Sequence, residues 1–433
     1  MLAAYALPAL PLAMLTLPFY VVVPAFYART LGLPIAAVGG ALLIVRLVDA
    51  VSDPLVGYLA DRWRPAFGRR RLWTLAASFP TAFAAYQIFA PPNDATLQHL
   101  TFWGILLSVF WTSVLVPYTA WGAELSTSYA GRTRIAAWRE MFAVVGTLVA
   151  LVVQAAALWA GQSERFALLT TGLLIGFGLP IAALMTVSAT PEPFDATQKR
   201  LPVRDGFALM ASNAPFVRLL FAFFLNGCAN GFPATLFLFF VSEKLQAETW
   251  AGPLLVIYFL CGVLGVPLWL KMAQQTSKHR AWCVAMIGAC GFFAIAPFLQ
   301  AGDAHWFALV CIGTGLALGA DVMLPPAIQA DVIDVDTAAS GEQRAGLYFA
   351  MWSLTTKLAL ALAVGVAFPV LALWGFDPAA NLRTNSGLAM LGFLYAGAPV
   401  LLKLASIALM WNFPLDAAAQ AQLRATIDAR QKS

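Results

Sequence analysis

Residues 44–71 read IVRLVDAVSDPLVGYLADRWRPAFGRRR, an apolar stretch that carries three charges and ends in a strongly basic segment. The apolar part begins at residue 35, and it is long enough to cross a membrane, because a helix of roughly 20 apolar residues spans the hydrocarbon core. Basic residues directly after such a run are typical of the cytoplasmic end of a membrane helix. The stretch therefore predicts a membrane span followed by a cytoplasmic connection.

The whole chain shares this composition. Of its 433 residues, 61% are hydrophobic and 11% are charged, whereas soluble domains carry about 25% charged residues. So few charged groups cannot cover the surface of a soluble globule. The composition argues against a soluble enzyme, a disordered protein and a nucleic-acid-binding protein, although the net charge is +5.

Apolar runs of membrane-spanning length recur along the chain, and we expect each of them to form a helix. The twelve expected spans are residues 8–28, 35–60, 72–90, 98–121, 137–160, 166–188, 215–241, 250–272, 281–299, 305–329, 345–373 and 386–411. With Met1 in the cytoplasm, the connections and tail on that side hold 19 Lys and Arg residues and those on the opposite side hold four. Cytoplasmic loops are enriched in basic residues, so both termini are predicted to be cytoplasmic.

The longest polar connection divides the spans evenly. The expected organisation is an N-terminal six-helix bundle at 1–188, a cytoplasmic linker at 189–214, a C-terminal six-helix bundle at 215–411 and a cytoplasmic tail at 412–433. Two such halves with a central linker are typical of transporters whose substrate path runs between the halves.

Three charged residues, Arg46, Asp49 and Asp53, lie within the span 35–60. Each costs about 2.5–3.5 kcal/mol at mid-membrane on insertion scales, so each needs a partner or a function. Asp49 and Asp53 are four residues apart and share one helix face, with Arg46 one turn earlier. Two carboxylates this close repel each other unless a cation lies between them, which predicts a site for Na⁺ or a shared proton. The alternative is an Arg–Asp pair that holds the helix to its neighbour.

Further charged residues lie in later spans. Lys357 is too deep in span 345–373 to reach the interface easily, and it is expected either to replace the cation when the carboxylate site empties or to form a static ion pair. Asp321 is a candidate gate or ion-pair residue, and Lys403 is expected to extend toward the cytoplasmic interface. Weaker candidates for lining a substrate cavity are Tyr118, Thr119, Trp121, Asn226, Asn230 and Thr356.

Three motifs resemble one transporter family in order along the chain: residues 46–71, 116–140 and 325–357. The family is that of the glycoside–pentoside–hexuronide:cation symporters, the melibiose-permease branch of the major facilitator superfamily. The matching positions are Gly57, Asp61, Arg62, Gly68, Arg69 and Arg70 in the first motif, Pro117, Tyr118, Glu124, Leu125, Arg132 and Arg139 in the second, and Asp331, Asp334, Gly341, Arg344, Gly346 and Lys357 in the third.

The resemblance implies an all-α integral membrane protein with the major facilitator fold, twelve helices in two six-helix bundles. It implies a secondary transporter of the bacterial inner membrane, not an enzyme, that couples an organic solute to Na⁺ or H⁺ by alternating access and needs no other cofactor. Asp49 and Asp53 fall on the family's cation-binding carboxylates, Thr112 on its threonine ligand and Lys357 on its lysine. The expected partners are a small-molecule substrate and the lipid bilayer, without nucleic acid, and the protein is expected to be a monomer.

The resemblance also implies an ionic lock on the cytoplasmic face, although charged loop residues are often merely solvated. Its expected members are Asp61, Arg62, Arg69, Arg70, Glu124, Arg132, Arg139, Asp331, Asp334 and Arg344.

Two departures from the family pattern leave the substrate open. Melibiose-type members use acids in their first and fourth spans for sugar hydroxyls, but the span 8–28 has no acid here and the second position is Leu115. An unpaired polar group in a dry pocket costs about 1–3 kcal/mol, so a sugar fits less well than in those members. A sugar or glycoside and a lysophospholipid-like amphiphile both remain candidate substrates. An exporter that exchanges hydrophobic compounds for a cation remains an alternative function.

Overall fold

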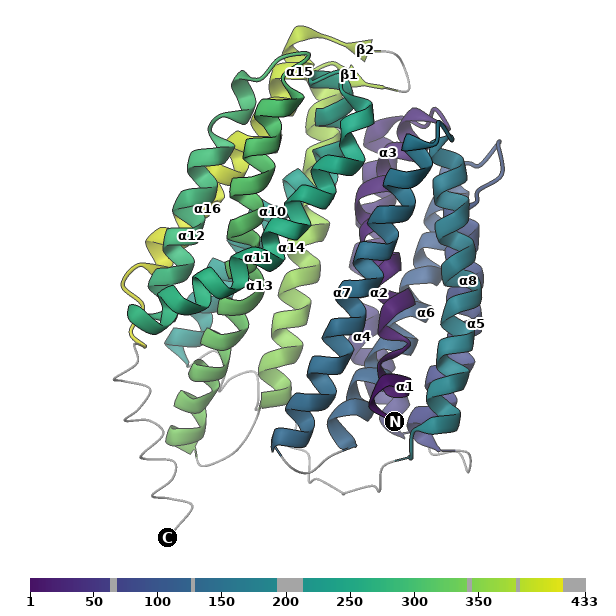
Figure 1. Cartoon of the computed structure of the whole chain (residues 1–433), viewed down its shortest axis with the longest axis vertical. Helices are drawn as coiled ribbons and strands as arrows, with labels where there is room; N and C mark the ends of the chain where they lie inside the picture. The colour runs from purple at the N-terminus through teal and green to yellow at the C-terminus, as the bar shows by residue number, and fades with distance from the viewer. Residues whose placement is uncertain (63–67, 126–128, 193–212, 341–344, 379–381, 416–433) are drawn as a thin grey trace. The chain divides into compact units, whose positions relative to one another are not determined.

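The computed structural model describes residues 1–62, 68–125, 129–192, 213–340, 345–378 and 382–415, and these are helical almost throughout (Figure 1). The chain divides into two compact units. The first comprises Met1–Thr197 and Val364–Leu388, and the second comprises Gln198–Ala363 and Ala389–Ser433. Most of the expected linker at 189–214 and of the expected tail at 412–433 lies outside the described residues.

In the first unit, the first span is broken into short helices because its prolines lack the N–H group that a continuous helix needs. The remaining helices of this unit are long and pack in a bundle, with α6 against α4 and α5, and α8 against α5. The elements are α1 (Leu2–Ala6), α2 (Ala9–Leu17), the π-helical turn η1 (Pro18–Val22), α3 (Val23–Arg29), α4 (Ile35–Arg62), α5 (Arg69–Phe89), α6 (Leu97–Glu124), α7 (Tyr129–Trp159) and α8 (Glu164–Ala189).

The second unit is built in the same way, with α13 against α11 and α12, and α16 against α10 and α12. Its elements are α10 (Ala214–Phe239), the π-helical turn η2 (Phe240–Lys244), η3 (Glu248–Trp250), α11 (Ala251–Gln275), α12 (Lys278–Phe293), η4 (Ala296–Phe298), α13 (Ala304–Ser340), η5 (Phe393–Gly397) and α16 (Ala398–Met410). Two helices contribute to both units: α14 (Ala345–Leu373) and α15 (Asn385–Gly392). Between them a short antiparallel hairpin joins β1 (Phe376–Asp377) to β2 (Leu382–Arg383), with Phe376 opposite Arg383.

Within the described part of the chain, eleven helical segments are long and apolar enough to cross a membrane. They correspond to the expected spans except for residues 72–90, which form α5. This helix carries Thr74, Ser78 and Thr81, whose polar side chains are buried within the unit and lower the helix's mean hydropathy. A count of twelve crossing helices therefore stays a prediction, as does the cytoplasmic placement of the termini.

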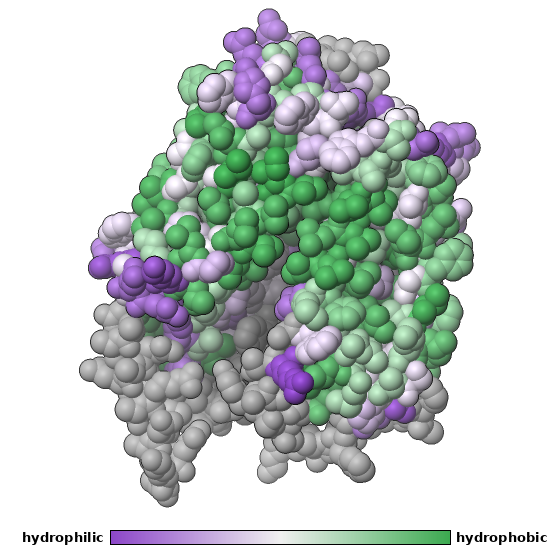
Figure 2. Space-filling view, in the orientation of Figure 1, coloured by the Kyte–Doolittle hydropathy of each residue, from purple (hydrophilic) through white to green (hydrophobic). Residues whose placement is uncertain are grey.

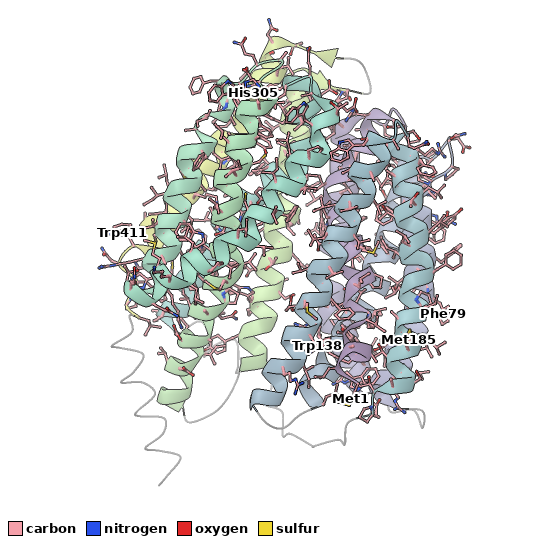
Figure 3. All side chains as sticks on the ribbon, in the orientation of Figure 1. Met1, Phe79, Trp138, Met185, His305 and Trp411 are labelled. Atoms are coloured by element: carbon pink, nitrogen blue, oxygen red, sulfur yellow. The ribbon has the colours of Figure 1, made fainter. Side chains whose placement is uncertain are left out.

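The outer faces of the helices are apolar. Phe79 on α5 is 59% exposed and Met185 on α8 is 49% exposed, and both point away from their helices at the edge of the first unit (Figure 3). On the visible face of each unit, hydrophobic residues cover the middle of the helices and hydrophilic residues gather near their ends (Figure 2). Such a surface is suited to lipid, because apolar patches of this extent are rare on soluble monomers.

Candidate functional site

The first unit brings α4 and α6 close together along two complementary stripes. Gly104 on α6 faces Val45 on α4, and a Cβ atom at Gly104 would lie only 2.8 Å from the Val45 Cγ2 atom. Because positions four residues apart share a helix face, Ser108 and Thr112 continue the stripe on α6. Asp49 and Asp53 continue the facing stripe on α4 in the same register.

The carboxylates and hydroxyls of these stripes meet. The Ser108 hydroxyl donates to the Asp49 Oδ1 atom at 2.7 Å. The Thr112 Oγ1 atom lies 2.8 Å from the Asp53 Oδ1 atom and 3.3 Å from the Asp49 Oδ1 atom. Asp49 is buried and Asp53 is half-buried. The structure thus brings Asp49, Asp53 and Thr112 together as expected, and it adds Ser108.

The shared hydroxyl of Thr112 has a chemical consequence. A threonine hydroxyl carries one hydrogen and two lone pairs, so it donates to only one of the two carboxylates at a time. Its lone pairs and the carboxylate oxygens form a set of oxygen ligands, which is the kind of ligand that hard cations prefer. The arrangement can therefore hold a cation or a proton between two like charges that would otherwise repel.

Arg46 lies one turn before these acids but is directed toward aromatic rings. Its guanidinium carbon stands 3.5 Å from the ring centroid of Tyr20 and 5.2 Å from that of Phe19, both in the π-helical turn η1. Only 4% of Arg46 is exposed. An arginine over an aromatic face gains about 2 kcal/mol or more when the pair is desolvated. The rings therefore hold the charge in place beside the carboxylates.

Tyr118 and Trp121, which the sequence suggested as cavity-lining residues, are fully buried in the core of the first unit. The hydroxyl of Tyr118 donates to the Tyr5 carbonyl at 2.9 Å, the Tyr5 hydroxyl donates to the Tyr118 carbonyl at 3.1 Å, and the two rings stack. The indole N–H of Trp121 donates to the Pro191 carbonyl at 3.0 Å. Thr119 is half-buried, and its hydroxyl lies within hydrogen-bond distance of carbonyls of its own helix.

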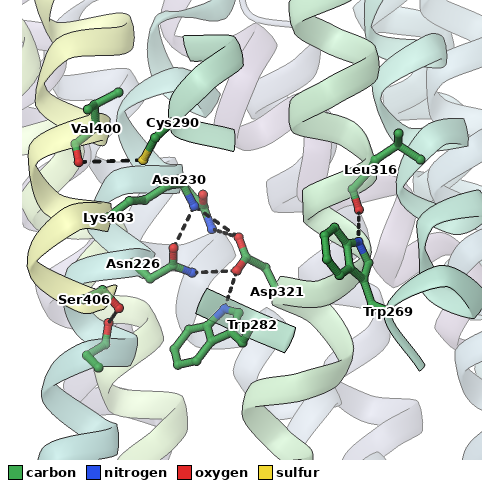
Figure 4. Close-up of polar contacts among 11 residues, drawn as sticks. Asn226, Asn230, Trp269, Trp282, Cys290, Leu316, Asp321, Val400, Lys403 and Ser406 are labelled. Carbon is green, nitrogen blue, oxygen red and sulfur yellow. Dashed lines mark hydrogen bonds and ion pairs between the residues drawn. The ribbon is translucent and has the colours of Figure 1, made fainter. Parts of the chain in front are cut away.

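The second unit contains a separate buried cluster around Asp321 of α13 (Figure 4). Its Oδ1 atom accepts hydrogen bonds from Asn226 at 3.0 Å and from the Trp282 indole at 2.6 Å. Its Oδ2 atom accepts from Asn230 at 2.9 Å and from the Lys403 ammonium at 3.3 Å. The five side chains come from α10, α12, α13 and α16, so the cluster ties four helices together.

Lys403 therefore does not extend toward the interface, as the sequence suggested. It is 1% exposed, and its ammonium donates to the Asn226 Oδ1 atom at 2.7 Å as well as to Asp321. The physical reason is the rotation of α16, which packs against α10 and presents Lys403 and Ser406 to it; Ser406 donates to the Ala222 carbonyl. This cluster makes Asp321 an ion-pair residue, and it occupies the amides of Asn226 and Asn230.

Lys357 and Thr356 lie on α14 within the second unit. Lys357 is half-buried, whereas Thr356 is exposed and donates to the Trp352 carbonyl at 3.0 Å. The pairing of Lys357 with the carboxylates of the first unit stays a prediction.

Of the expected ionic-lock residues, Arg344 and the side chains of Asp61, Arg62, Arg69, Glu124 and Arg132 lie outside the described part of the structure. In the first unit, Arg139 binds its neighbour Glu140, with a shortest N–O distance of 2.7 Å. In the second unit, Asp331 pairs with Lys278, also at 2.7 Å, and Asp334 is half-buried.

Arg70 belongs to a local anchor at the start of α5. Its backbone N–H and that of Arg71 donate to the carboxylate of Glu192, at 2.8 Å and 3.2 Å. A carboxylate is stabilised at a helix N-terminus by the free N–H groups and the helix dipole. Gly68 precedes them with a φ of +109°, a backbone conformation that L side chains rarely adopt. These contacts fix the basic end of the motif against the C-terminal end of α8.

The arrangement of these helices is that of known membrane transporters. The solved structure of the nucleoside transporter NupG matches this chain with a TM-score of 0.68 and 15% identity, over 94% of this chain and 98% of that chain. The chain therefore shares the fold of that transporter.

The chain belongs to the MFS/sugar transport protein family, whose model matches residues 4–417. The human sodium-dependent lysophosphatidylcholine symporter 1 is 23% identical over 90% of this chain and 78% of its own length. The putative glycoside/cation symporter YagG of Escherichia coli is also 23% identical, over 87% of this chain and 83% of its own length. The family and these relatives identify the protein as a multi-pass membrane transporter of the major facilitator type and not an enzyme.

Proposed function

We propose that the protein is a sodium-coupled symporter, in which Na⁺ binds at Asp49, Asp53, Ser108 and Thr112 and drives the uptake of an organic solute. The observation that carries this proposal is the convergence of two carboxylates on the hydroxyl of Thr112. A proton would need only one carboxylate, whereas a metal ion uses the hydroxyl oxygens as well. The names of the two relatives, one sodium-dependent and one glycoside/cation, support cation coupling.

The repulsion between the two carboxylates can couple cation binding to the transport of the solute. Two carboxylates in a poorly hydrated interior repel more strongly than they do in water, because the effective dielectric constant is lower. A bound cation removes most of this repulsion and draws α4 and α6 together. We expect the filled site to pre-organise the solute cavity, and the two halves then to alternate in their access to each side of the membrane.

The sodium site is tested by the thermal stability of the purified protein. NaCl is compared with choline chloride at constant ionic strength and pH, because a ligand that binds the native state raises its stability, by about 2.7 kcal/mol at 100 times its Kd. We expect Na⁺ to raise the Tm of the wild type but not that of Asp49→Asn or Asp53→Asn. The exposed carboxylate variant Asp94→Asn is the matched control and should respond like the wild type.

Two results would overturn parts of the proposal. If Na⁺ leaves the Tm of the wild type unchanged while pH shifts it only when Asp49 and Asp53 are intact, the coupling ion is a proton. Proteoliposomes with an inward Na⁺ gradient test the direction, with a methyl glycoside and lysophosphatidylcholine as probes. Gradient-driven loss of a probe from the vesicles would replace symport with export by antiport.

A further inference from the structure

Two sets of groups in the first unit attract the charge of Arg46. The faces of two aromatic rings form one set, because the guanidinium carbon lies 3.5 Å from the ring centroid of Tyr20 and 5.2 Å from that of Phe19. The carboxylates of the cation site form the other set, since Asp49 follows three residues later on α4 and is close enough to act on this charge. The position of the guanidinium between the two sets therefore decides how strongly it acts on the cation site.

The geometry of α4 favours the rings. Side chains of an α-helix lean toward its N-terminus, so Arg46 extends away from the turn that follows it. The arginine also precedes the acid, which is the less favourable order for an ion pair on one helix face. Both effects direct the guanidinium toward the π-helical turn η1, whereas Ser108 and Thr112 of α6 bind the carboxylates.

The rings that contact Arg46 are held by further aromatic contacts. Phe19 and Tyr20 meet edge to face, with centroids 5.7 Å apart. The Tyr20 centroid also lies 6.4 Å from that of Trp111, which directly precedes Thr112 on α6. Consecutive side chains of a regular α-helix point about 100° apart, but in the π-helical turn two consecutive rings lie against one guanidinium. Such turns occur frequently at functional sites.

We propose that Tyr20 is a positioning residue of the cation site, whose ring holds the Arg46 guanidinium away from Asp49 and Asp53 and so keeps these carboxylates open to Na⁺. This inference rests on the proposed function. The attraction between a guanidinium and an aromatic face is stronger when the pair is desolvated, as it is here. Without the ring, the guanidinium can pair with the carboxylates, where its charge competes with Na⁺.

The ring acts on the apparent affinity for Na⁺ and not on the ligands themselves. When the arginine occupies the carboxylates in part of the molecules, the apparent Kd equals the intrinsic Kd divided by the fraction of molecules whose site is open. Closing the site in about nine molecules of ten therefore raises the apparent Kd on the order of tenfold. A positive charge close to the site also repels Na⁺ more strongly in a poorly hydrated interior than it does in water.

The test is a cycle of variants, measured as thermal stabilisation by NaCl compared with choline chloride. Tyr20→Leu removes the ring, and we expect the NaCl concentration at the midpoint of stabilisation to rise on the order of tenfold. Tyr20→Phe keeps the ring and should keep the midpoint of the wild type. In an Arg46→Gln background, Tyr20→Leu should no longer shift the midpoint, because the competing charge is absent. A merely structural role of the ring would leave the shift unchanged in that background.

Tyr27→Leu is the matched control, because Tyr27 is a buried tyrosine of the same span whose hydroxyl donates to the Ile88 carbonyl at 3.2 Å. It should lower the Tm but leave the Na⁺ midpoint unchanged. If Tyr20→Leu is too unstable to purify, Phe19→Leu takes its place and should give a smaller shift in the same direction, since its ring is more distant. Arg46→Met, which also removes the charge, repeats the cycle if Arg46→Gln does not fold.

The outcomes separate this inference from the proposed function. An unchanged Na⁺ midpoint in the ring variants, or a shift that persists after the charge of Arg46 is removed, would overturn the positioning role of Tyr20 while the Na⁺ response of the wild type leaves the proposed function intact. Absence of a Na⁺ response in the wild type would instead contradict the proposed function.

Discussion

Thr112 is the residue on which the cation site depends, because its hydroxyl lies within 3.3 Å of both carboxylates. Thr112→Val keeps the shape of the side chain but removes the oxygen ligand. We expect it to raise the NaCl concentration at the midpoint of thermal stabilisation by about tenfold, the effect of losing one hydrogen-bonding group of about 1–1.5 kcal/mol.

Two controls accompany this prediction. Thr112→Ser retains the hydroxyl and should keep a midpoint close to that of the wild type. Thr119 lies on the same helix, and its hydroxyl is within hydrogen-bond distance of carbonyls of that helix, so Thr119→Val should leave the midpoint unchanged. A Thr112→Val variant with an unchanged Na⁺ midpoint would remove this hydroxyl from the site.

At this scale the sequence predicts the acids well and the hydroxyls poorly. Asp49 and Asp53 stand out because charge is rare in a membrane span and their spacing puts them on one face. Ser108 was missed, although it lies four residues before Thr112. A serine in a helix commonly donates to a carbonyl of its own helix, as Ser113 does to Val109 at 2.7 Å, so the residue type alone does not reveal a ligand.

At the scale of elements, the distance between α4 and α6 decides whether the four ligands meet. Gly104→Ala places a methyl group against Val45, with a Cβ–Cγ2 distance of 2.8 Å unless the helices move apart. We expect the variant to weaken Na⁺ stabilisation several-fold by separating the helices. The double variant Gly104→Ala/Val45→Ala restores the space and should recover the Na⁺ midpoint; failure to recover would mean that the spacing is not what limits binding.

The Asp321 cluster is a second element-level feature, because it connects four helices through one carboxylate. Lys403→Met leaves a buried carboxylate without its counter-charge and should destabilise the second unit by about 3–5 kcal/mol. The double variant Asp321→Asn/Lys403→Met removes both charges and should cost less than the sum of the single changes. Thermal unfolding of the purified variants measures this coupling, and additive losses would contradict an ion pair.

The orientation of Lys403 shows why the expectation from the sequence was wrong for this side chain. Its distance from the end of the span suggested an interfacial residue, but its direction depends on how α16 is rotated against α10. Asp321 is 82 residues earlier in the chain than its partner. The periodicity of a single span does not reveal contacts between residues that are so far apart in the chain.

For the whole molecule, the basic residues predict which side each connection faces. Within the first unit, Ala4 accepts a hydrogen bond from Thr186 near the end of α8, and Tyr5 binds Tyr118 near the end of α6. The N-terminus thus lies at the same end of the unit as the basic connections that follow α4 and α6. This agrees with the sidedness that the charge distribution predicts.

Sidedness is testable with single introduced thiols. We expect an impermeant maleimide to label Gln162→Cys in intact cells but Thr276→Cys only after permeabilisation, because the distribution of basic residues predicts an outer connection for the first and a cytoplasmic one for the second. Both positions are exposed, whereas four of the five native cysteines are buried and Cys261 is half-buried. The unmodified protein gives the background, and the reverse pattern would invert the topology.

The sequence by itself determined the class of the protein and the position of its ionisable groups along the spans. It did so because burial in lipid imposes length, apolar composition and a charge asymmetry that are all local properties of the chain. Only the tertiary structure decided which side chains meet: Ser108 with Asp49, Lys403 with Asp321, and Arg46 with the ring of Tyr20. The physical reason is that these contacts depend on the rotation and close approach of helices distant in sequence, which packing of the whole unit sets.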